Sequence, residues 1–392
     1  MATRSLFPSS EAATLESSSP SWIQASAPAE MSGSEAYELL RTCLSHRSAA
    51  ARRSALQSFV DAGIDWDVVQ REARRHRVLP LLYRALEEVL GPDLPSSLRE
   101  QAEEHRRGVR IRNTFVVQEL GRLTECFDRA DLPFLVMKGP VLARTAYGDI
   151  ALRHSVDADV FVPRARFSEV ERALHDLGYE YAEKRKAVSG WRKSLSLYLD
   201  GQWEFRRGRS FMLDVHTRLM PPGYPFPSDF SPFWERARPV RLSEEVTVQG
   251  FSAEDRLLVL SHHGIKNQWR ALRHVADIAA VLRRADNLDW ERMLAPAEGI
   301  GAARALKLGL HMAHDLLGAS LPSYVEQWFS ERSVRDVAAS MKDYLRKRPE
   351  TSALAYRERV RLQLATKDTL AGQLRYGAHS LLQHLWSALL RP

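Results

Sequence analysis

The sequence predicts an α+β fold in which a small mixed β-sheet lies between two helical segments. Between residues 132 and 220, short apolar runs alternate with turn-forming residues, which is the pattern of consecutive strands. On both sides of this segment, apolar residues recur at the spacing of amphipathic helices. The Asp200-Gly201 pair between two alternating runs is the strongest hairpin signal in the chain. Strands grouped in one segment and helices grouped outside it favour an α+β core.

The composition is that of an ordinary globular protein. Of the 392 residues, 44% are hydrophobic and 27% are charged, and the length predicts two or three domains. The 56 Lys and Arg against 49 Asp and Glu suit phosphate-bearing partners but are too few to indicate nucleic acid. Cys43 and Cys126 predict no disulfide framework. Without a long apolar run or a secretory signal, we expect a cytoplasmic protein with no membrane partner.

Changes in composition divide the chain into six predicted segments. They are a disordered leader over 1–33, an N-terminal helical module over 34–131, the sheet-containing core over 132–220, a Pro-rich bridge over 221–250, a C-terminal helical module over 251–348 and a basic helical tail over 349–392.

The helices before the core have clear start and stop signals. Asp65 is a suitable N-cap, and Gly91-Pro92 ends an apolar helix over 78–90. A longer helix over 96–129 is basic in its first half, which indicates a solvated face or a guide for a polyanionic substrate. Its apolar side predicts a buried stripe formed by Phe115, Val116, Leu120, Leu123 and Phe127.

The core predicts a strand over 134–137, a short helix over 140–147 and a loop through Arg153. The elements that follow are a strand over 158–162, a helix over 167–177 closed by Gly178, and strands over 179–183, 195–199, 202–206 and 211–216. After the bridge, Ser252 is the predicted N-cap of a helix that includes Lys266. Further helices are predicted over 271–284, from an N-cap at Asp289, and over 302–317 and 370–390.

Candidate chemistry lies at the start of the strand over 158–162. If the run from Asp157 is extended, Asp157 and Asp159 point to the same face of the sheet. Two adjacent carboxylates repel each other unless a cation lies between them, and Mg²⁺ binds such carboxylates together with substrate phosphates. The alternative is a solvated strand edge or a turn, because Asp-x-Asp triplets are common by chance.

Three neighbouring features favour the metal interpretation. Lys138-Gly139 follows the preceding apolar run, where a tight turn could present backbone N–H groups to phosphate. Arg153 and Ser155 precede the two aspartates in the pattern Arg-x-Ser-x-Asp-x-Asp. Downstream, the apolar run over 211–216 contains Asp214, which could supply a third carboxylate, and His216 on the same face.

These residues resemble the nucleotidyltransferase superfamily, which has the DNA polymerase β-like fold, and in particular its uncharacterised bacterial branch. The resemblance covers roughly residues 35–320 and is most specific between 133 and 219. The matching positions are Lys138-Gly139, Leu142, Tyr147, Arg153, Asp157, Asp159, Asp214 and His216. One departure is that Gly139 is followed by Pro140, where the superfamily has Ser. This loses a hydroxyl contact to phosphate that Ser155 could replace.

The resemblance implies a nucleotidyltransferase that transfers a nucleoside monophosphate from an NTP, such as ATP, and releases pyrophosphate. Two Mg²⁺ ions would be held by Asp157 and Asp159, and Asp214 would complete the site of one of them. The nucleotide would be contacted by a set of polar groups around these aspartates, for which the resemblance and the pattern offer Lys138, Gly139, Arg153, Ser155, His216 and Lys266.

Other functions find less support in the sequence. His262, His263 and His274 with Asp277 could indicate a metal or phosphohydrolase centre, although a structural role is commoner for single histidines. There is no Walker A sequence, Gly-x-Gly-x-x-Gly or Gly-x-Ser-x-Gly motif. The alternative to an enzyme is an inactive nucleotide-binding or protein-interaction module of a biosynthetic or toxin–antitoxin system. The acceptor stays open among a small molecule, a tRNA and a protein.

Overall fold

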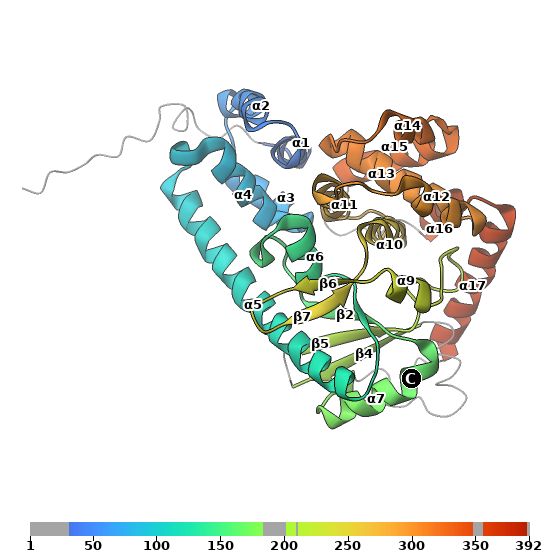
Figure 1. Ribbon diagram of the computed structural model, residues 1–392. Coiled ribbons are helices and arrows are strands. Elements are labelled where there is room, and N and C mark those ends of the chain that lie inside the picture. The colour runs from blue at the N-terminus through green and yellow to red at the C-terminus, as the bar shows by residue number, and fades with distance from the viewer. Residues whose placement is uncertain (1–30, 183–200, 209–210, 348–355, 390–392) are drawn as a thin grey trace, which may run out of the picture.

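The computed structural model describes residues 31–182, 201–208, 211–347 and 356–389. It confirms the α+β fold, since Figure 1 shows one mixed sheet flanked by helices. The predicted strand over 195–199 and nearly all of the predicted leader lie outside the described residues.

The sheet of the described residues has seven strands in the order β3-β4-β5-β2-β1-β7-β6. Strands β2 and β5 are parallel, as are β1 and β7, and the other neighbours are antiparallel. The strand bounds are β1 Leu135–Val136, β2 Asp157–Phe161, β3 Glu180–Tyr181, β4 Gln202–Arg207, β5 Phe211–His216, β6 Arg238–Arg241 and β7 Thr247–Gly250.

One face of the sheet is covered by helices α5 (Ser96–Arg129) and α7 (Phe167–Asp176). Ala158 and Val160 of β2 are buried in the apolar cluster that these two helices share with the sheet. Because successive side chains of a strand alternate, Asp157 and Asp159 are left on the opposite face. The alternation that the sequence predicted for β2 is therefore the one that the structure has.

The remaining helices come from both sides of the sheet segment in the sequence. Most of them contribute to one large hydrophobic cluster, so the helices before and after the sheet pack together, as Figure 1 also shows. None of the described helices is long and apolar enough to cross a membrane. The helices before the sheet are α1 Gly33–Leu44, α2 Ala49–Ala62, α3 Trp66–Arg75, α4 Leu79–Leu90 and η1 Gly91–Asp93.

Short helical turns and the later helices complete the chain. Within the core they are α6 Pro140–Leu142, the π-helical turn η2 Ala143–Tyr147, η3 Ile150–Leu152 and η4 Arg164–Arg166. Beyond the strand β5 they are α9 Ser231–Glu235, α10 Ala253–Lys266, α11 Leu272–Arg284, α12 Trp290–Gly299, α13 Ala303–Leu317, α14 Ser323–Glu326, η6 Gln327–Ser330, α15 Arg332–Lys347, α16 Tyr356–Ala365 and α17 Leu370–Leu389.

The predicted N-caps are confirmed, and the predicted buried stripe of α5 is confirmed except at one residue. Asp65, Ser252 and Asp289 accept hydrogen bonds from backbone N–H groups as the predicted N-caps. The buried stripe of α5 is confirmed for its other four members, but Phe115 is 36% exposed and the prediction is wrong there. Its ring packs against that of Phe211, at the start of β5, with ring centroids 5.8 Å apart.

Strands β6 and β7 lie in the Pro-rich bridge, where the sequence analysis predicted no strand. β7 pairs with β1 in the sheet, and β6 is the edge strand beyond it. Pro239 lies within β6, and proline is tolerated there because an edge strand has backbone N–H groups that pair with no neighbour. The prolines of this segment therefore led to the prediction of a bridge where the structure has a pair of strands.

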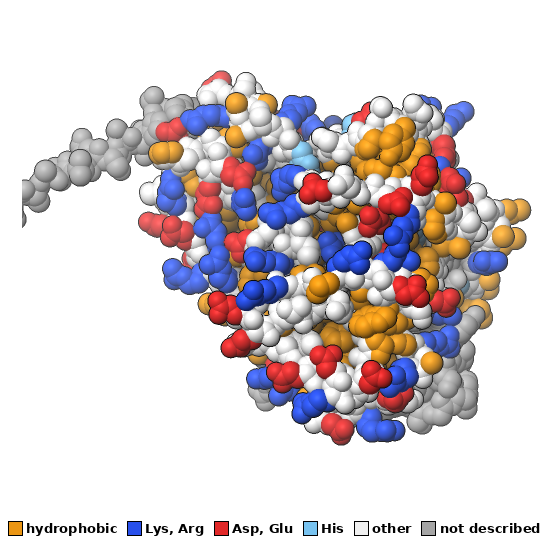
Figure 2. All heavy atoms as spheres, viewed as in Figure 1, with side chains coloured by type: hydrophobic (Ala, Val, Ile, Leu, Met, Phe, Trp, Pro, Cys, Tyr) orange, Lys and Arg blue, Asp and Glu red, His pale blue; other side chains and the backbone are white. Residues whose placement is uncertain are grey.

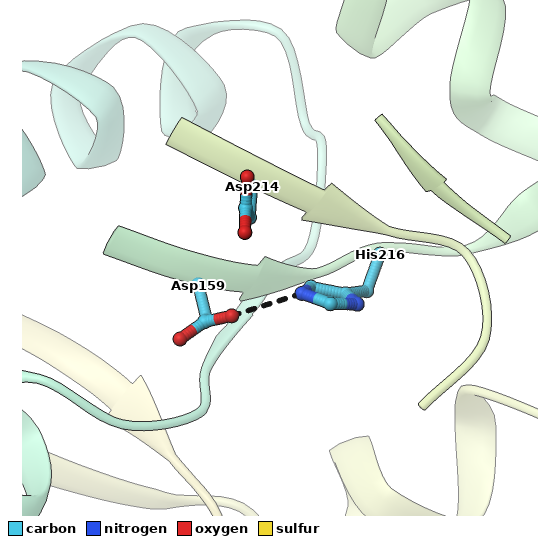
Figure 3. A group of neighbouring side chains, drawn as sticks. All are labelled: Asp159, Asp214 and His216. Carbon is cyan, nitrogen blue, oxygen red and sulfur yellow. Dashed lines mark hydrogen bonds and ion pairs between the residues drawn. The ribbon is translucent and has the colours of Figure 1, made fainter. Parts of the chain in front are cut away.

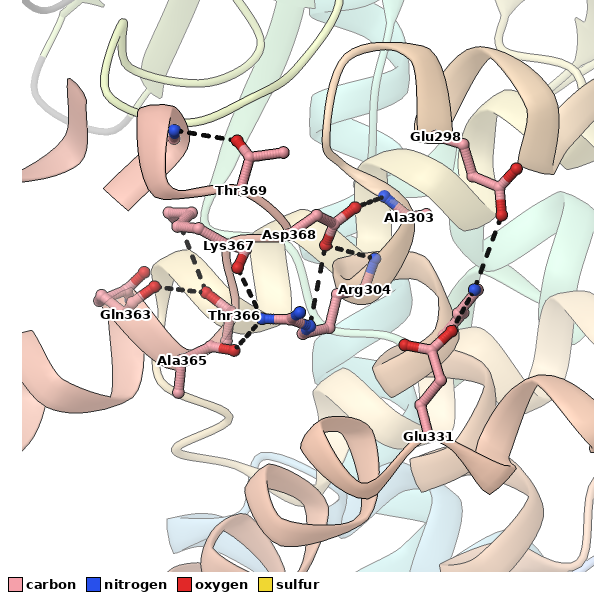
Figure 4. A network of polar contacts seen from close by, with 12 residues as sticks. Glu298, Ala303, Arg304, Glu331, Gln363, Ala365, Thr366, Lys367, Asp368 and Thr369 are labelled. Atoms are coloured by element: carbon pink, nitrogen blue, oxygen red, sulfur yellow. Dashed lines mark hydrogen bonds and ion pairs between the residues drawn. The ribbon is translucent and has the colours of Figure 1, made fainter. Parts of the chain in front are cut away.

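The end of the chain is fastened to the helical body. The Asp368 carboxylate, between α16 and α17, accepts from the backbone N–H groups of Ala303 and Arg304 at 2.9 and 3.0 Å (Figure 4). It thereby caps helix α13, which has no side-chain cap of its own. The amide of Gln363 in α16 donates to the carbonyl of Ile265 at 2.6 Å. The C-terminal helices therefore touch the end of α10, next to Lys266.

A glycine sets the distance between α10 and α13, which leads to the first prediction. A Cβ on Gly309 would lie 2.8 Å from Cβ of Ser261 and 3.1 Å from Cδ1 of Ile278. Gly309→Ala should therefore lower the free energy of unfolding by roughly 1–3 kcal/mol, although alanine is the better helix former. Urea denaturation would measure the change.

Gly108 in helix α5 is the matched control, because a Cβ there meets no atom within 4 Å. Gly108→Ala should stabilise the protein by about 0.5–1 kcal/mol. Equal effects of the two substitutions would contradict the close approach of α10 and α13.

Candidate active site

A cavity of about 460 Å³ opens above the ends of strands β1, β2 and β5. Its walls also include the α3–α4 junction, the loop before β2 and the connection between α10 and α11. Its size is within the range of small-molecule sites in proteins. The predicted site residues Lys138, Gly139, Arg153, Ser155, Asp157, Asp159, Asp214, His216 and Lys266 all line it.

Asp159 and Asp214 face each other across the parallel pair β2 and β5. The register places Asp159 directly beside Asp214, so their side chains leave the sheet on the same face. Together with His216, they offer ligand atoms that all lie within 4.8 Å of one another (Figure 3). In the part of the chain that the structure describes, this is the one group of three such residues that could hold a metal ion.

Neighbouring side chains hold these two carboxylates in place. The Nε2 atom of His216 lies 3.0 Å from Oδ1 of Asp159, a hydrogen bond in which the ring N–H donates to the carboxylate. The amide of Gln202, on strand β4, donates to Oδ2 of Asp214 at 2.8 Å. Each carboxylate therefore has one oxygen fixed by the protein.

Asp157 lines the same cavity but is outside the group of three residues. Burial, followed by repulsion from Asp159, raises the pKa of Asp157, and Lys138 partly offsets this effect. Its carboxylate therefore lies close enough to Asp159 to interact electrostatically. Its predicted role as a shared metal ligand stays a prediction.

The pKa values of Asp159 and Asp214 are shifted in opposite directions. Burial acts to raise the pKa of Asp159, but Lys138 and the hydrogen bond from His216 outweigh it and hold the pKa below its usual value. Burial, and then repulsion from Asp159 and Asp157, raises the pKa of Asp214 to about 7. Burial and the two neighbouring carboxylates therefore disfavour the ionised form of Asp214.

A tight turn follows strand β1 and leads into helix α6. Gly139 has φ of 60° and ψ of −134°, a conformation that other residues rarely adopt. A Cβ at this position would lie 3.4 Å from Oγ of Ser155. Lys138 before it is buried, and burial lowers the pKa of its ammonium although Asp159 acts to raise it.

The loop before β2 is anchored by helix α5. The amide nitrogen of Asn113 donates to the carbonyl of Arg153 at 2.8 Å, and its carbonyl oxygen accepts from the N–H of Ser155 at 3.2 Å. The Ser155 side chain is 3% exposed, and its Oγ has no hydrogen-bond partner among the described residues. A buried hydroxyl without a partner at a cavity wall is available to a ligand.

Arg153 is bound to the protein itself. Its guanidinium makes a two-pronged ion pair with Asp277 of helix α11, with Nε to Oδ1 at 3.0 Å and Nη2 to Oδ2 at 3.1 Å. The hydroxyl of Tyr147 donates to the same carboxylate at 2.8 Å. The three side chains are buried and link the loop before β2 to the helices after the sheet.

Lys266 lines the cavity from the last turn of α10, opposite the sheet. His263, one turn earlier, and His274 of α11 also line it, with ring centroids 5.5 Å apart. Burial lowers the pKa of His263 well below its ordinary value and that of His274 to about 3. His262 points elsewhere and donates from Nδ1 to the carbonyl of Leu258. Among the described residues, these histidines belong to no metal-binding group of three.

Several residues that shape the site carry no local signal in the sequence. Gln202 and Asn113 reach the site through strand pairing and helix packing between distant segments. Arg77 and Arg273 line the cavity from segments that come before and after the sheet in the sequence. Because arginines are spread over the whole chain, the sequence does not single out these two.

The mixed sheet and the paired aspartates at its cavity agree with the nucleotidyltransferase resemblance of the sequence. A family model described as "Uncharacterised nucleotidyltransferase" matches residues 62–318, well over half of the chain. The chain belongs to this family.

Comparison with solved structures gives weaker similarities. The chain is similar to the crystal structure of ANT(2'')-Ia in complex with adenylyl-2''-tobramycin, with 14% identity, coverage of 47% of this chain and 97% of that chain, and a TM-score of 0.32. It is also similar to the solution structure of the antibiotic-resistance factor ANT(2'')-Ia, with 15% identity, coverage of 59% and 97%, and a TM-score of 0.30. These low scores carry no argument about activity. No curated protein matches the chain in a sequence comparison.

The raised pKa of Asp214 generates a prediction about stability. An unfolded carboxyl ionises near pH 4, whereas Asp214 in the folded protein holds its proton to about pH 7. The folded state therefore binds more protons between these values, and its stability falls as the pH rises from about 4 to about 7. In buffer without divalent cations, Asp214→Asn should stabilise the protein at pH 8, on the order of 1–2 kcal/mol after allowance for solvent screening.

Thermal melts of both proteins with EDTA would measure this difference at pH 5 and pH 8. The gap should be smaller at pH 5, and Asp176→Asn, an exposed position on α7, should change stability at neither pH. A variant no more stable than the wild type at pH 8 would show that Asp214 is not under electrostatic repulsion.

Proposed function

We propose that the chain is a Mg²⁺-dependent nucleotidyltransferase that transfers a nucleoside monophosphate from an NTP to an acceptor hydroxyl and releases pyrophosphate. The observation that carries the proposal is the direct pairing of Asp159 with Asp214 on parallel strands, at a cavity that Lys138 and Lys266 also line. Family membership supports nucleotidyl transfer in general. Family membership does not identify the metal or the acceptor, and we propose both.

The donor set suits Mg²⁺. Asp159 and Asp214 supply the hard oxygen ligands that this ion prefers. Burial, and then repulsion from Asp159 and Asp157, raises the pKa of Asp214, and a bound cation would favour its charged form. We assign both residues to the metal site, with Asp157 as a further ligand for a second ion. When bound, Mg²⁺ would neutralise phosphate charge and polarise the reacting oxygens.

The protein's own groups would bind and orient the nucleotide. Lys138, Lys266 and the backbone N–H groups of the turn at Gly139 would offset the negative charge of the triphosphate. The Ser155 hydroxyl would replace the missing serine after Gly139 as a donor to phosphate. His216 would keep the Asp159 carboxylate in one orientation. Arg153, bound to Asp277, would act mainly through its positive charge.

The bond changes are those of a displacement at phosphorus. The acceptor oxygen forms a bond to the α-phosphorus, and the bond from that phosphorus to the bridging oxygen of the β-phosphate breaks. Pyrophosphate leaves with the electron pair, and the acceptor proton passes to solvent. The inactive-module alternative is less favoured because all three aspartates line the cavity.

A direct experiment tests the reaction. The purified chain would be incubated with each NTP, labelled at the α-phosphate, together with Mg²⁺ and a cell extract. Mass spectrometry would then search for a nucleotidyl adduct. Release of pyrophosphate that depends on both the extract and Mg²⁺ is the expected result. No turnover of any NTP under these conditions would favour the inactive module.

Asp159 provides the sharpest test of the metal site. Asp159→Asn should lower the rate of Mg²⁺-dependent transfer by about 100-fold or more, because a buried anionic ligand is lost at the position where charge develops. Pyrophosphate release would measure the rate, and circular dichroism would check the fold. Asp176→Asn, which leaves the cavity unchanged, is the matched control. Near-normal turnover of Asp159→Asn would remove this residue from the metal site.

Lys266 tests the binding of the triphosphate. If its ammonium contacts phosphate in the ground state, Lys266→Ala should raise the KM for NTP by about 10- to 150-fold and change kcat much less. Lys266→Arg, which keeps the positive charge, should retain most of the affinity. Steady-state kinetics separate KM from kcat, and unchanged values for Lys266→Ala would confine nucleotide binding to the sheet side of the cavity.

A further inference from the structure

The charges of the cavity are divided between its floor and its opening. The floor holds the three aspartates with Lys138 beside them. Nearer the opening lie two further arginines, which we call the arginine rim: Arg77 and Arg273. Arg77 is exposed, and Arg273 is partly buried. The rim thus adds two positive charges to a cavity that Lys138 and Lys266 also line.

The rim is built from two loops that are joined to each other. Arg77 follows helix α3, and Arg273 lies in the first turn of α11. His76 connects them, because its Nδ1 accepts from the N–H of Leu272 at 3.1 Å and its carbonyl accepts from the N–H of Arg273 at 3.2 Å. Segments far apart in the sequence therefore present arginines to one cavity.

Both loops contain strained backbone. Arg77 has a φ of 56°, and Gln268 and Trp269 have φ values of 58° and 50°. Positive φ is unfavourable for side chains of this size, and such residues cluster at functional sites. The strain is thus located in the two connections that carry the rim.

The rim lacks carboxylate partners within the described part of the chain. The Nε atom of Arg273 is buried without a hydrogen-bond partner. The charges acting most strongly on Arg273 are Arg153, Asp277 and Arg77, and Asp277 is already paired with Arg153. Burial and then Arg153 lower the pKa of Arg273 to about 10, as expected for a cation among cations. An anion at this place would relieve the repulsion.

Within the described residues, the basic half of α5 does not form a continuous track of unpaired charge that would favour nucleic acid. On helix α5, Arg106 and Arg110 form ion pairs with Glu87 and Asp149, and Arg112 donates to the carbonyl of Val156. On the face shown in Figure 2, Lys and Arg side chains are interspersed with Asp and Glu. These contacts engage three arginines of α5, whereas the rim lines a cavity of about 460 Å³, which suits a small anion better than a polymer.

We propose that the arginine rim binds a phosphate group of the acceptor, so that the nucleotidyl acceptor is a small phosphorylated molecule. This inference rests on the proposed function. Guanidinium groups bind phosphate through two parallel hydrogen bonds, which gives orientation as well as charge. With its phosphate on the rim, the acceptor directs its hydroxyl toward the aspartates on the floor.

Calorimetry on the full chain tests the rim with inorganic phosphate as the probe. The protein is first saturated with Mg²⁺ and an NTP analogue that has a methylene group between the α- and β-phosphates, which occupies the triphosphate position. Phosphate should then bind the loaded wild type. Arg77→Asn and Arg273→Gln should each weaken this binding by about 10-fold or more. Asparagine is used at Arg77 because it tolerates positive φ.

Three controls make the experiment specific. Arg77→Lys keeps the charge and should retain most of the phosphate affinity, while Arg172→Gln, on the surface of α7, should have no effect. The affinity for the NTP analogue should stay within about twofold in all variants. Thermal melts check that each variant is folded.

The possible outcomes separate the proposals. Phosphate binding that is absent from the loaded wild type, or equal in the Arg77 and Arg273 variants, overturns the rim. Loss of affinity for the NTP analogue in these variants would assign the rim to the triphosphate. This result would overturn the proposed acceptor site but not the proposed nucleotidyl transfer. Acetate binding as tightly as phosphate, or a short oligonucleotide binding about 100-fold tighter, overturns the small phosphorylated acceptor. If the wild type does not bind the NTP analogue, the proposed function fails. If phosphate binding in that case still requires Arg77 and Arg273, the arginine rim is upheld as an anion site.

Discussion

Two carboxylates stand side by side on neighbouring parallel strands, and their mutual repulsion is the constraint to which the surrounding site responds. Asp159 and Asp214 are fixed in register by the β2–β5 pairing, so neither can move away without breaking the sheet. Lys138 and His216 stabilise the charge on Asp159, and Gln202 donates to Asp214. This compensation is partial, since the pKa of Asp214 stays near 7. A bound cation would relieve these unfavourable electrostatics, as the proposed metal site requires.

The same face of the sheet depends on helices from both ends of the chain. Asn113 of α5 holds the backbone of the loop before β2, and Asp277 of α11 holds Arg153 in that loop. Removing one partner of a buried ion pair leaves an uncompensated charge, so this link is sensitive to either residue. Helices that come before and after the sheet in the sequence share one hydrophobic cluster. The loop before β2 is therefore held between helices that pack together. The position of Ser155 and Asp157 therefore depends on packing far from both residues in sequence.

The parts of this site that were predictable from the sequence are those encoded within one strand. Alternation places Asp157 with Asp159, and Asp214 with His216, and the strands carry these faces as the pattern indicates. Pairing between strands and contacts between distant helices have no local signal, so Gln202, Asn113 and the partnership of Arg153 with Asp277 could not be predicted. Strands β6 and β7 were missed because they lie in a segment predicted to be a Pro-rich bridge, and the edge strand β6 tolerates Pro239. The segment boundaries and the catalytic roles remain predictions.

The separation of charge within the cavity bears on how two anions could react there. A triphosphate and an anionic acceptor repel each other, and this repulsion strengthens as water is excluded. Cations on the floor alone would favour the triphosphate and leave the acceptor at a disadvantage. We propose that the rim arginines supply positive charge for the acceptor, because they lie on different segments from Lys138 and Lys266. Because rim and floor belong to separate elements held by Asp277 and His76, the geometry between the two anions is set by the packing of helices on the sheet. Specificity for the acceptor can then vary through the α3–α4 and α10–α11 connections while the aspartates on the strands stay unchanged.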